Sequence, residues 1–268
     1  ALADEAFCRA VVRAIGEQAR KRDYDLLLFN ADRFDSPDRM TTCATLSKLC
    51  DGLLLLMPTA DDRFLDVVER QQLNCALVFF DARQLALPTI VLENRIGARR
   101  AVEHLLGLGH RRIAFIAGTK RTGQSAERER GYTEALAAAG IAVDPRLVVD
   151  GAFNQPGGFA ATRRLLELDA PPTAIFAAND EMAFGAIDAI ASRGLKVPGD
   201  VSVVGFDDIS TASHVFPRLT TMRQPYDALA ERAVAEVVAM IEGRPPAAAR
   251  IGFATELVVR DSSGPART

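Results

Sequence analysis

The sequence has few of the residues that build metal, redox or nucleophilic sites. Its 268 residues include four cysteines and three histidines. The cysteines form no C-x-x-C pair and have no histidine at ligand spacing, so neither a zinc site nor a redox motif is indicated. No histidine lies in a G-x-S-x-G or H-E-x-x-H setting. We therefore expect no cofactor, no metal site and no catalytic residue.

The chain also lacks a long apolar run and a concentration of basic charge. The longest apolar run, 52–58, is too short to span a bilayer. Residues 1–7 include Asp4 and Glu5 and do not read as a secretory signal. Lys and Arg are spread along a chain of net charge −3, which argues against a nucleic-acid surface formed by these residues. The expected protein is cytoplasmic, with reduced thiols and no membrane contact.

What the sequence has is a repeated alternation of apolar strand-length segments with amphipathic helical ones. In a chain of this length, two lobes are as reasonable as one. The first part predicts helices over 4–22, 39–50 and 62–71 and strands over 24–29, 52–57, 75–80 and 89–92. Continuous apolar strands between helices are typical of a parallel sheet covered on both faces. Since no strand precedes the first helix, we expect further sequence upstream.

The same alternation restarts after residue 97. It predicts helices over 97–108, 125–139, 157–168 and 180–192, and strands over 112–117, 147–150, 173–177 and 201–206. The last part predicts a connector over 220–224, a helix over 227–241 and one terminal strand over 251–259. The predicted fold class is therefore α/β, with two doubly wound parallel-sheet lobes.

Polar or aromatic residues follow the strands of the second lobe. They are Arg128, Phe153, Asn179 and Asp207, the last of which is followed by Asp208. In an open parallel sheet, ligands bind outside the carboxyl ends of the strands. A cation, an aromatic ring, an amide and a carboxylate at one edge suit a small polyhydroxylated or heterocyclic ligand.

Other interpretations of these residues stay open from the sequence. Arg128 could lie on a solvated helix face, and Phe153 could be buried in the core. We expect Asp180 to cap its helix and to leave Asn179 for the ligand. Either Asp207 or Asp208 could simply begin a turn.

The loop GTKRTGQS, residues 118–125, nearly matches a phosphate-binding loop. It follows a predicted strand and precedes a predicted helix. Gln124 stands where that motif requires lysine, so the main counter-charge for the phosphates is missing. Nucleotide hydrolysis is therefore not expected.

Five segments together resemble the LacI/GalR family of bacterial transcription regulators. They are ENRIGARRAVEHLLGLGHRRIAF (93–115), ERERGYTEALAAAG (127–140), PTAIFAANDEMAFGA (172–186), VPGDVSVVGFDD (197–208) and PRLTTMRQP (217–225). The resemblance implies the effector-binding core of such a regulator, with the fold of type I periplasmic binding proteins. Its lobes would comprise residues 1–91 with 225–248 and 92–224 with 249–268, joined by three hinge crossings near Leu92, Gln224 and Ala248.

The resemblance also implies a set of effector contacts in a cleft between the lobes. These are Arg128, Phe153, Asn179, Asp207 and Gln224, with Phe7 and Asp81 from the first lobe. The motif around Phe7 here reads EAFC, which departs from the family's N-P-F-F. Operator DNA would be bound only through an N-terminal helix-turn-helix headpiece outside this chain, and a homodimer is implied.

The mixture of Arg, Asp, Asn and aromatic side chains suggests a sugar or sugar derivative as the effector, with a purine as the second choice. A periplasmic-type sugar receptor of the same fold is the alternative function, and a hydrolase or nucleotide enzyme is a distant third. The residues do not distinguish an inducer from a corepressor.

Overall fold

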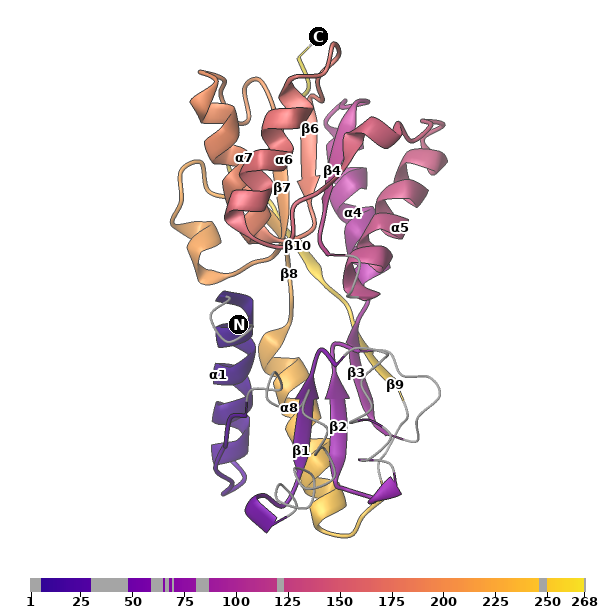
Figure 1. Ribbon diagram of the computed structural model, residues 1–268, viewed down its shortest axis with the longest axis vertical. Helices are drawn as coiled ribbons and strands as arrows, with labels where there is room; N and C mark the ends of the chain where they lie inside the picture. The colour runs from indigo at the N-terminus through magenta and orange to yellow at the C-terminus, as the bar shows by residue number, and fades with distance from the viewer. Residues whose placement is uncertain are drawn as a thin grey trace, which may run out of the picture. The chain divides into compact units, whose positions relative to one another are not determined.

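The computed structural model divides into two compact units (Figure 1). Unit 1 comprises Ala1–Leu92 and Pro225–Phe253, and unit 2 comprises Glu93–Gln224 and Ala254–Thr268. The chain passes from one unit to the other after Leu92, after Gln224 and after Phe253. The structure describes residues 6–29, 48–58, 65, 68, 70–80, 87–119, 123–245 and 250–267.

Unit 1 contains a sheet of four parallel strands in the order β1-β2-β3-β9. The strands are β1 (Leu53–Leu56), β2 (Cys75–Val78), β3 (Thr89–Leu92) and β9 (Arg250–Phe253). The helices α1 (Ala6–Arg20) and α8 (Tyr226–Ile241) pack against each other, and α8 packs on the sheet. Their core faces recur at helical spacing, for example Val11, Ala14 and Ile15 on α1, which explains why these segments fold as amphipathic helices.

Unit 2 contains a six-stranded sheet in the order β10-β8-β7-β6-β4-β5. All neighbouring pairs are parallel except β10 with β8. The strands are β4 (Ile113–Ala117), β5 (Val148–Asp150), β6 (Ala174–Ala177), β7 (Ser202–Asp207), β8 (Thr220–Arg223) and β10 (Glu256–Val258). The central strands are apolar and buried on both faces, as expected for a covered parallel sheet.

Two pairs of helices cover this sheet. The pair α4 (Asn94–Gly107) with α5 (Gly123–Ala138) lies on one face, and α6 (Gln155–Leu166) with α7 (Asp180–Ser192) lies on the other (Figure 1). Helices on both faces of a mainly parallel sheet define a doubly wound arrangement. The predicted α/β fold class is confirmed.

Three predicted elements differ from the structure. The predicted strand over 24–29 has no ladder with any described strand, and Leu27 and Leu28 are 57% and 58% exposed. An apolar run becomes a strand only where a neighbour accepts its backbone hydrogen bonds. The predicted connector over 220–224 is the strand β8, because β7 and β10 pair with it on its two sides.

The third difference concerns the end of the chain. The single strand predicted over 251–259 is two strands, β9 and β10, which join different sheets. Residues 250–253 therefore belong to unit 1, although the sequence suggested the second lobe. The predicted helices over 39–50 and 62–71 fall largely outside the described residues.

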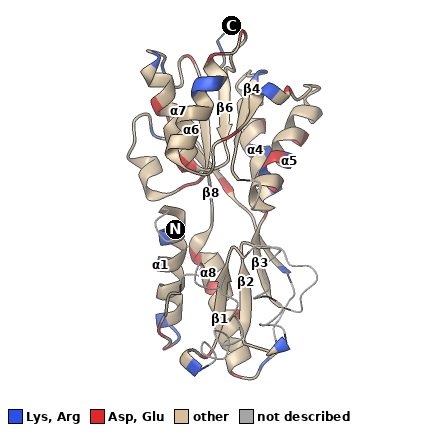
Figure 2. Ribbon diagram, viewed as in Figure 1, with Lys and Arg blue, Asp and Glu red and all other residues tan. Residues whose placement is uncertain are grey.

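Helices α4 and α5 carry charged residues of both signs (Figure 2). Arg95 pairs with Glu134 at 2.5 Å and Arg99 with Glu103 at 2.7 Å. Such exposed pairs contribute little stability and keep the surface of these helices well hydrated. Among the described residues, no helix combines the length and apolar character needed to cross a bilayer.

Candidate functional site at the strand ends of unit 2

The polar residues predicted from the sequence gather at one edge of the unit 2 sheet. Strands β4, β6, β7 and β8 are parallel, so their carboxyl ends lie at the same edge. Arg128 comes from the helix after β4, and Asn179 follows β6. Asp207 is the last residue of β7, and Gln224 follows β8. The topology thus brings together residues almost one hundred positions apart in the sequence.

Arg128 lies inside unit 2 and is only 2% exposed. Its Nε donates to Asn94 Oδ1 at 2.9 Å, and its Nη1 donates to the carbonyl oxygen of Ala178. The guanidinium carbon lies 3.8 Å from the ring centroid of Phe206, which is a cation–π contact. The alternative of a solvated helix face is therefore wrong for Arg128.

Asp207 links Arg128 to Gln224. Its Oδ1 lies 3.6 Å from Arg128 Nη1 and accepts a 2.5 Å hydrogen bond from Gln224 Nε2. Both side chains of the ion pair are almost completely buried, so water screens the pair weakly. We call Arg128, Asp207 and Gln224 the strand-end cluster. Their contacts form a continuous polar path across the edge of the sheet.

Asn179 is the N-cap of α7. Its Oδ1 accepts from the backbone N–H of Met182 at 2.9 Å, and its Nδ2 donates to the carbonyl oxygen of Phe153 at 3.1 Å. The prediction that Asp180 caps this helix is wrong, because Asn179 has the extended backbone and the capping bond. Asn179 still lies at the strand-end edge, where it holds the loop of Phe153.

Phe153 is half-buried and lies against Gly118, the residue after β4. A β-carbon on Gly118 would come within 2.0 Å of Phe153 Cζ. The absence of a side chain at position 118 is therefore what allows the aromatic ring to lie over the end of β4. Phe153 has a left-handed backbone, with φ of 58°.

Asp180 is completely buried behind the cluster. Its carboxylate accepts from Thr221 Oγ1 at 2.5 Å and from the backbone N–H of Ile209 at 2.9 Å. Burial, followed by the nearby carboxylate of Asp207, raises the pKa of Asp180 well above its usual range. Asp180 thus fastens the start of α7 to β8 and to the loop after β7.

Asp208 turns away from the strand-end cluster toward two arginines. It accepts from Arg223 Nε at 2.7 Å and from Arg260 Nη2 at 2.7 Å. Asp207 and Asp208 both have positive φ, 122° and 55°. Positive φ is uncommon outside glycine; Asp tolerates the left-handed region at 55°, where Asp208 lies, better than most residues, whereas 122° at Asp207 lies outside that region. The two adjacent carboxylates therefore serve different partners.

The two residues predicted from the first lobe have different outcomes. Phe7 lies on α1 in unit 1, where its ring centroid is 5.1 Å from that of Phe79 and 5.8 Å from that of Tyr226. These contacts place Phe7 at the edge of the unit 1 core. Asp81 lies outside the described residues.

Sequence reasoning missed three residues that bind the strand-end cluster or the neighbouring Asp208. Asn94, at the start of α4, orients Arg128, while Arg223 and Arg260 neutralise Asp208. None of them follows a predicted strand in a way that separates it from ordinary surface polar residues. The pairing of β8 with β7 and β10 reveals the positions of Arg223 and Arg260, and the hydrogen bond to Arg128 reveals that of Asn94.

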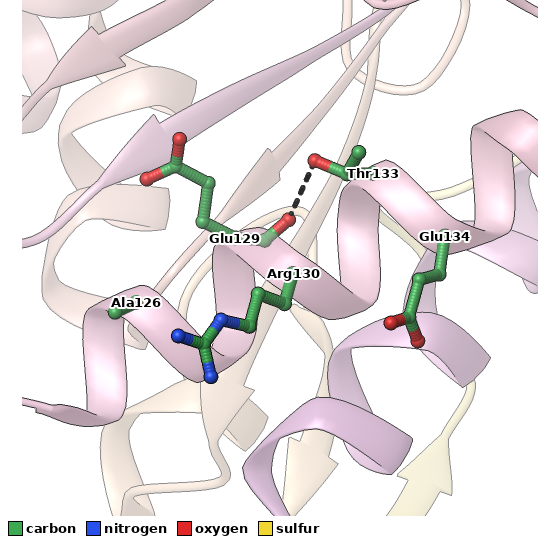
Figure 3. Close-up of a pocket in the computed structure, with 5 residues that line it drawn as sticks. All are labelled: Ala126, Glu129, Arg130, Thr133 and Glu134. Atoms are coloured by element: carbon green, nitrogen blue, oxygen red, sulfur yellow. Dashed lines mark hydrogen bonds between the residues drawn. The ribbon is translucent and has the colours of Figure 1, made fainter.

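A hollow of about 360 Å³ lies on the outer side of α5 (Figure 3). It is lined by Ala126, Glu129, Arg130, Thr133 and Glu134. The Thr133 hydroxyl donates to the Glu129 carbonyl at 3.0 Å. Arg130 forms a surface ion pair with Glu127, and Glu134 forms one with Arg95. None of the predicted site residues lines it. Among the described residues, no group of three or more His, Cys, Asp or Glu side chains could hold a metal ion.

Comparisons with known proteins agree with this architecture. Residues 102–263 match the family model described as a periplasmic binding protein-like domain. The chain is 32% identical over 261 residues to the HTH-type transcriptional repressor CytR of Escherichia coli strain K12, covering 97% of this chain and 76% of that protein.

Two solved structures are similar over nearly the whole chain. One is a regulatory protein of the LacI family from Chloroflexus aggregans, with a TM-score of 0.85, 29% identity, and coverage of 95% of this chain and 92% of that one. The other is a complex of the transcriptional regulator CelR with cellobiose, with a TM-score of 0.85, 31% identity, and coverage of 97% and 80%.

Proposed function

This chain belongs to the LacI family of transcriptional regulators, and from that premise we propose that the strand-end cluster of unit 2 binds its small-molecule effector. Asp207 and Gln224 would bind polar groups of the effector, with Arg128 holding the Asp207 carboxylate in place. Phe153 and Asn179 would form the neighbouring wall.

The observation that carries this proposal is the side chain of Gln224. It is buried, and its Nε2 is engaged by Asp207 while its Oε1 has no hydrogen-bond donor among the described residues. A buried acceptor without a donor costs about 1–3 kcal/mol, so native structures rarely keep one without a reason. A hydroxyl or amine of an effector beside Asp207 would supply the missing donor.

The chemistry favours a sugar or sugar derivative. Asp207 and Gln224 offer oxygen acceptors for hydroxyl groups, while the exposed part of the Phe153 ring offers an apolar face. The structural neighbour solved with cellobiose supports this class. A purine, which also presents N–H donors and a flat ring, is the second candidate.

The effector would act by favouring one conformational state of the regulator over another. A ligand shifts such an equilibrium only by its difference in affinity for the two states. We propose that this coupling reaches operator DNA through a helix-turn-helix domain, as the name of the relative CytR suggests. The regulator would work as a homodimer in the cytoplasm, where the DNA is. A periplasmic sugar receptor is less well supported, since the relatives reported above are transcriptional regulators.

A thermal-shift screen of sugars, sugar phosphates, nucleosides and nucleobases tests the proposal. A ligand at one hundred times its Kd adds about 2.7 kcal/mol to the free energy of unfolding, which a melting curve resolves easily. Calorimetry on Asp207→Asn follows with the best ligand. Because a charged hydrogen bond contributes about 1.5–3 kcal/mol, we expect affinity to fall by at least about tenfold.

Asp261→Asn is the matched control, because Asp261 lies in unit 2 and pairs with Arg218 at the surface. It should bind the ligand as the wild type does. Equal affinity of wild type and Asp207→Asn would show that the effector binds elsewhere. A response to nucleobases and not to sugars would replace the first candidate by the second.

A further inference from the structure

Asp208 is held by two cations that come from different parts of the chain. Arg223 and Arg260 each donate to it at 2.7 Å, one to each carboxylate oxygen. The Asp208 side chain is only 7% exposed, and that of Arg260 is 13% exposed. Arg260 is further fixed by a 2.7 Å bond from its Nη1 to the carbonyl oxygen of Leu219. We call Asp208, Arg223 and Arg260 the Asp208 junction.

The two arginines lie on two of the three segments through which the chain enters or leaves unit 2. Arg223 precedes Gln224, after which the chain passes into unit 1. Arg260 follows the third crossing, in which the chain returns to unit 2 at Ala254. Strands β8 and β10 pair antiparallel with Arg223 opposite Glu256, and Arg223 Nη1 lies 3.7 Å from the Glu256 carboxylate. The two segments are thus held side by side within unit 2.

The junction is also directly attached to the strand-end cluster. Asp208 follows Asp207 in the chain, and both have positive φ. The backbone N–H of Gln224 donates to the carbonyl oxygen of Asp207 at 3.3 Å, beside the side-chain bond between the same residues. A backbone in this restricted region has few alternative conformations, so a movement of the Asp207 side chain cannot be absorbed easily between the two residues.

We infer that Asp208 is a positioning residue that ties the carboxylate of Asp207 to two of the three chain segments that connect unit 2 with unit 1, those at 222–224 and 254–260. An effector bound at Asp207 would therefore change the packing of 222–224 and 254–260 together. Asp208 itself does not touch the effector. This inference rests on the proposed function for the effector, but its first test requires no ligand.

That first test is amide hydrogen exchange of the purified chain. In Asp208→Asn, the amides of Gln224 and Arg260 should exchange about tenfold faster or more, because the ionic link that restrains both segments is weakened. The amides of β4 and β6 should keep their protection. Asp261→Asn is the control, since it removes the same charge from the residue next to Arg260 and breaks the exposed ion pair with Arg218, while the ion pairs of Asp208 remain.

A second set of variants separates positioning from general destabilisation. Arg223→Lys keeps a cation beside Asp208 and should retain most of the protection at Arg260, whereas Arg223→Gln should lose it in part. Both substitutions affect a side chain that is about half exposed, so these variants are expected to fold. If position 223 matters only for packing, Arg223→Lys should not protect the Arg260 amide better than Arg223→Gln does.

The third test uses perturbation of the cluster itself. Asp207→Asn, without any ligand, should alter exchange at Arg260 in the wild-type background and not in the Asp208→Asn background. With cellobiose as the probe, added protection at 254–260 should appear in the wild type and be absent from Asp208→Asn, even though cellobiose still binds that variant.

The outcomes distinguish the two proposals. If cellobiose and the other screened ligands fail to bind while Asp207→Asn still acts on Arg260 only through Asp208, the junction stands and the proposed effector class falls. If Asp208→Asn leaves exchange at Gln224 and Arg260 unchanged, or if Asp207→Asn acts on Arg260 equally in both backgrounds, the junction is refuted.

Discussion

Replacing Arg128 by methionine tests whether the buried charges of the strand-end cluster depend on one another. Methionine keeps a long apolar side chain, so most of the packing against Phe206 remains. The change removes the bonds to Asn94 and Ala178 and leaves the Asp207 carboxylate buried without its cation. Removing one partner of a buried pair costs about 3–5 kcal/mol, so Arg128→Met should lower the free energy of unfolding of unit 2 by about that amount.

The decisive variant is the double substitution Arg128→Met with Asp207→Asn. A neutral amide at position 207 removes the uncompensated carboxylate and also its repulsion of Asp180. We therefore expect the double variant to be more stable than Arg128→Met alone. Against a total stability of about 5–15 kcal/mol for a typical domain, the difference is measurable.

The measurement is hydrogen exchange of the β6 amides as a function of urea, which reports on the unfolding of unit 2 separately from unit 1. Asp207→Asn alone gives the fourth corner of the double-mutant cycle. Additive effects of the two substitutions, or a cost below about 1 kcal/mol for Arg128→Met, would refute the claim that these charges are coupled and buried. In that case, a loss of effector binding in Arg128→Met could not be explained by a displaced Asp207 carboxylate.

Three further predictions concern single residues. The raised pKa of Asp180 means that its stabilising contribution is complete below the unfolded value near 4 and is lost as pH rises through the folded pKa. The melting temperature of Asp180→Asn should therefore depend less on pH above 4 than that of the wild type, whereas the exposed control Asp188→Asn should show the wild-type pH dependence. Gly118→Ala should displace Phe153, destabilise unit 2 by about 1–3 kcal/mol and weaken effector binding in calorimetry; unchanged affinity would exclude Phe153 from the site. Phe216 is 88% exposed, and if it lies in the proposed dimer interface, Phe216→Asp should be monomeric by light scattering where Phe216→Leu remains dimeric.

The positions of three predicted site residues could be derived from the sequence because parallel strands share one carboxyl edge. Arg128, Asn179 and Asp207 each follow an apolar strand in a βα alternation, and that alone brings them to the same side of unit 2. Gln224 came from the family resemblance, since the sequence did not identify β8 as a strand. Their assignment as effector contacts stays a prediction.

The roles of the residues at the strand ends were harder to predict, because they depend on contacts with residues that are distant in the sequence. In the Asn179-Asp180 pair either residue is a good helix cap. What decides between them is Thr221 and the backbone of Ile209, which take both oxygens of Asp180 from 41 and 29 residues away. Likewise, a single apolar pattern near the end of the chain could not show that β9 and β10 join separate sheets.

Gln224 has one hydrogen-bond acceptor that no described residue uses, and this relates the cost of burying that side chain on folding to the affinity for a ligand. Gln224 Oε1 is buried and has no hydrogen-bond donor among the described residues. The free-energy cost of removing water from the buried side chains of Asp207 and Gln224 is already part of the free energy of folding. An effector whose hydroxyl groups reach Asp207 and Gln224 would therefore gain hydrogen bonds without a further desolvation cost on the protein side. A ligand of similar shape without those hydroxyls would leave the same groups unsatisfied, which is why a cluster of this kind selects strongly for polar ligands.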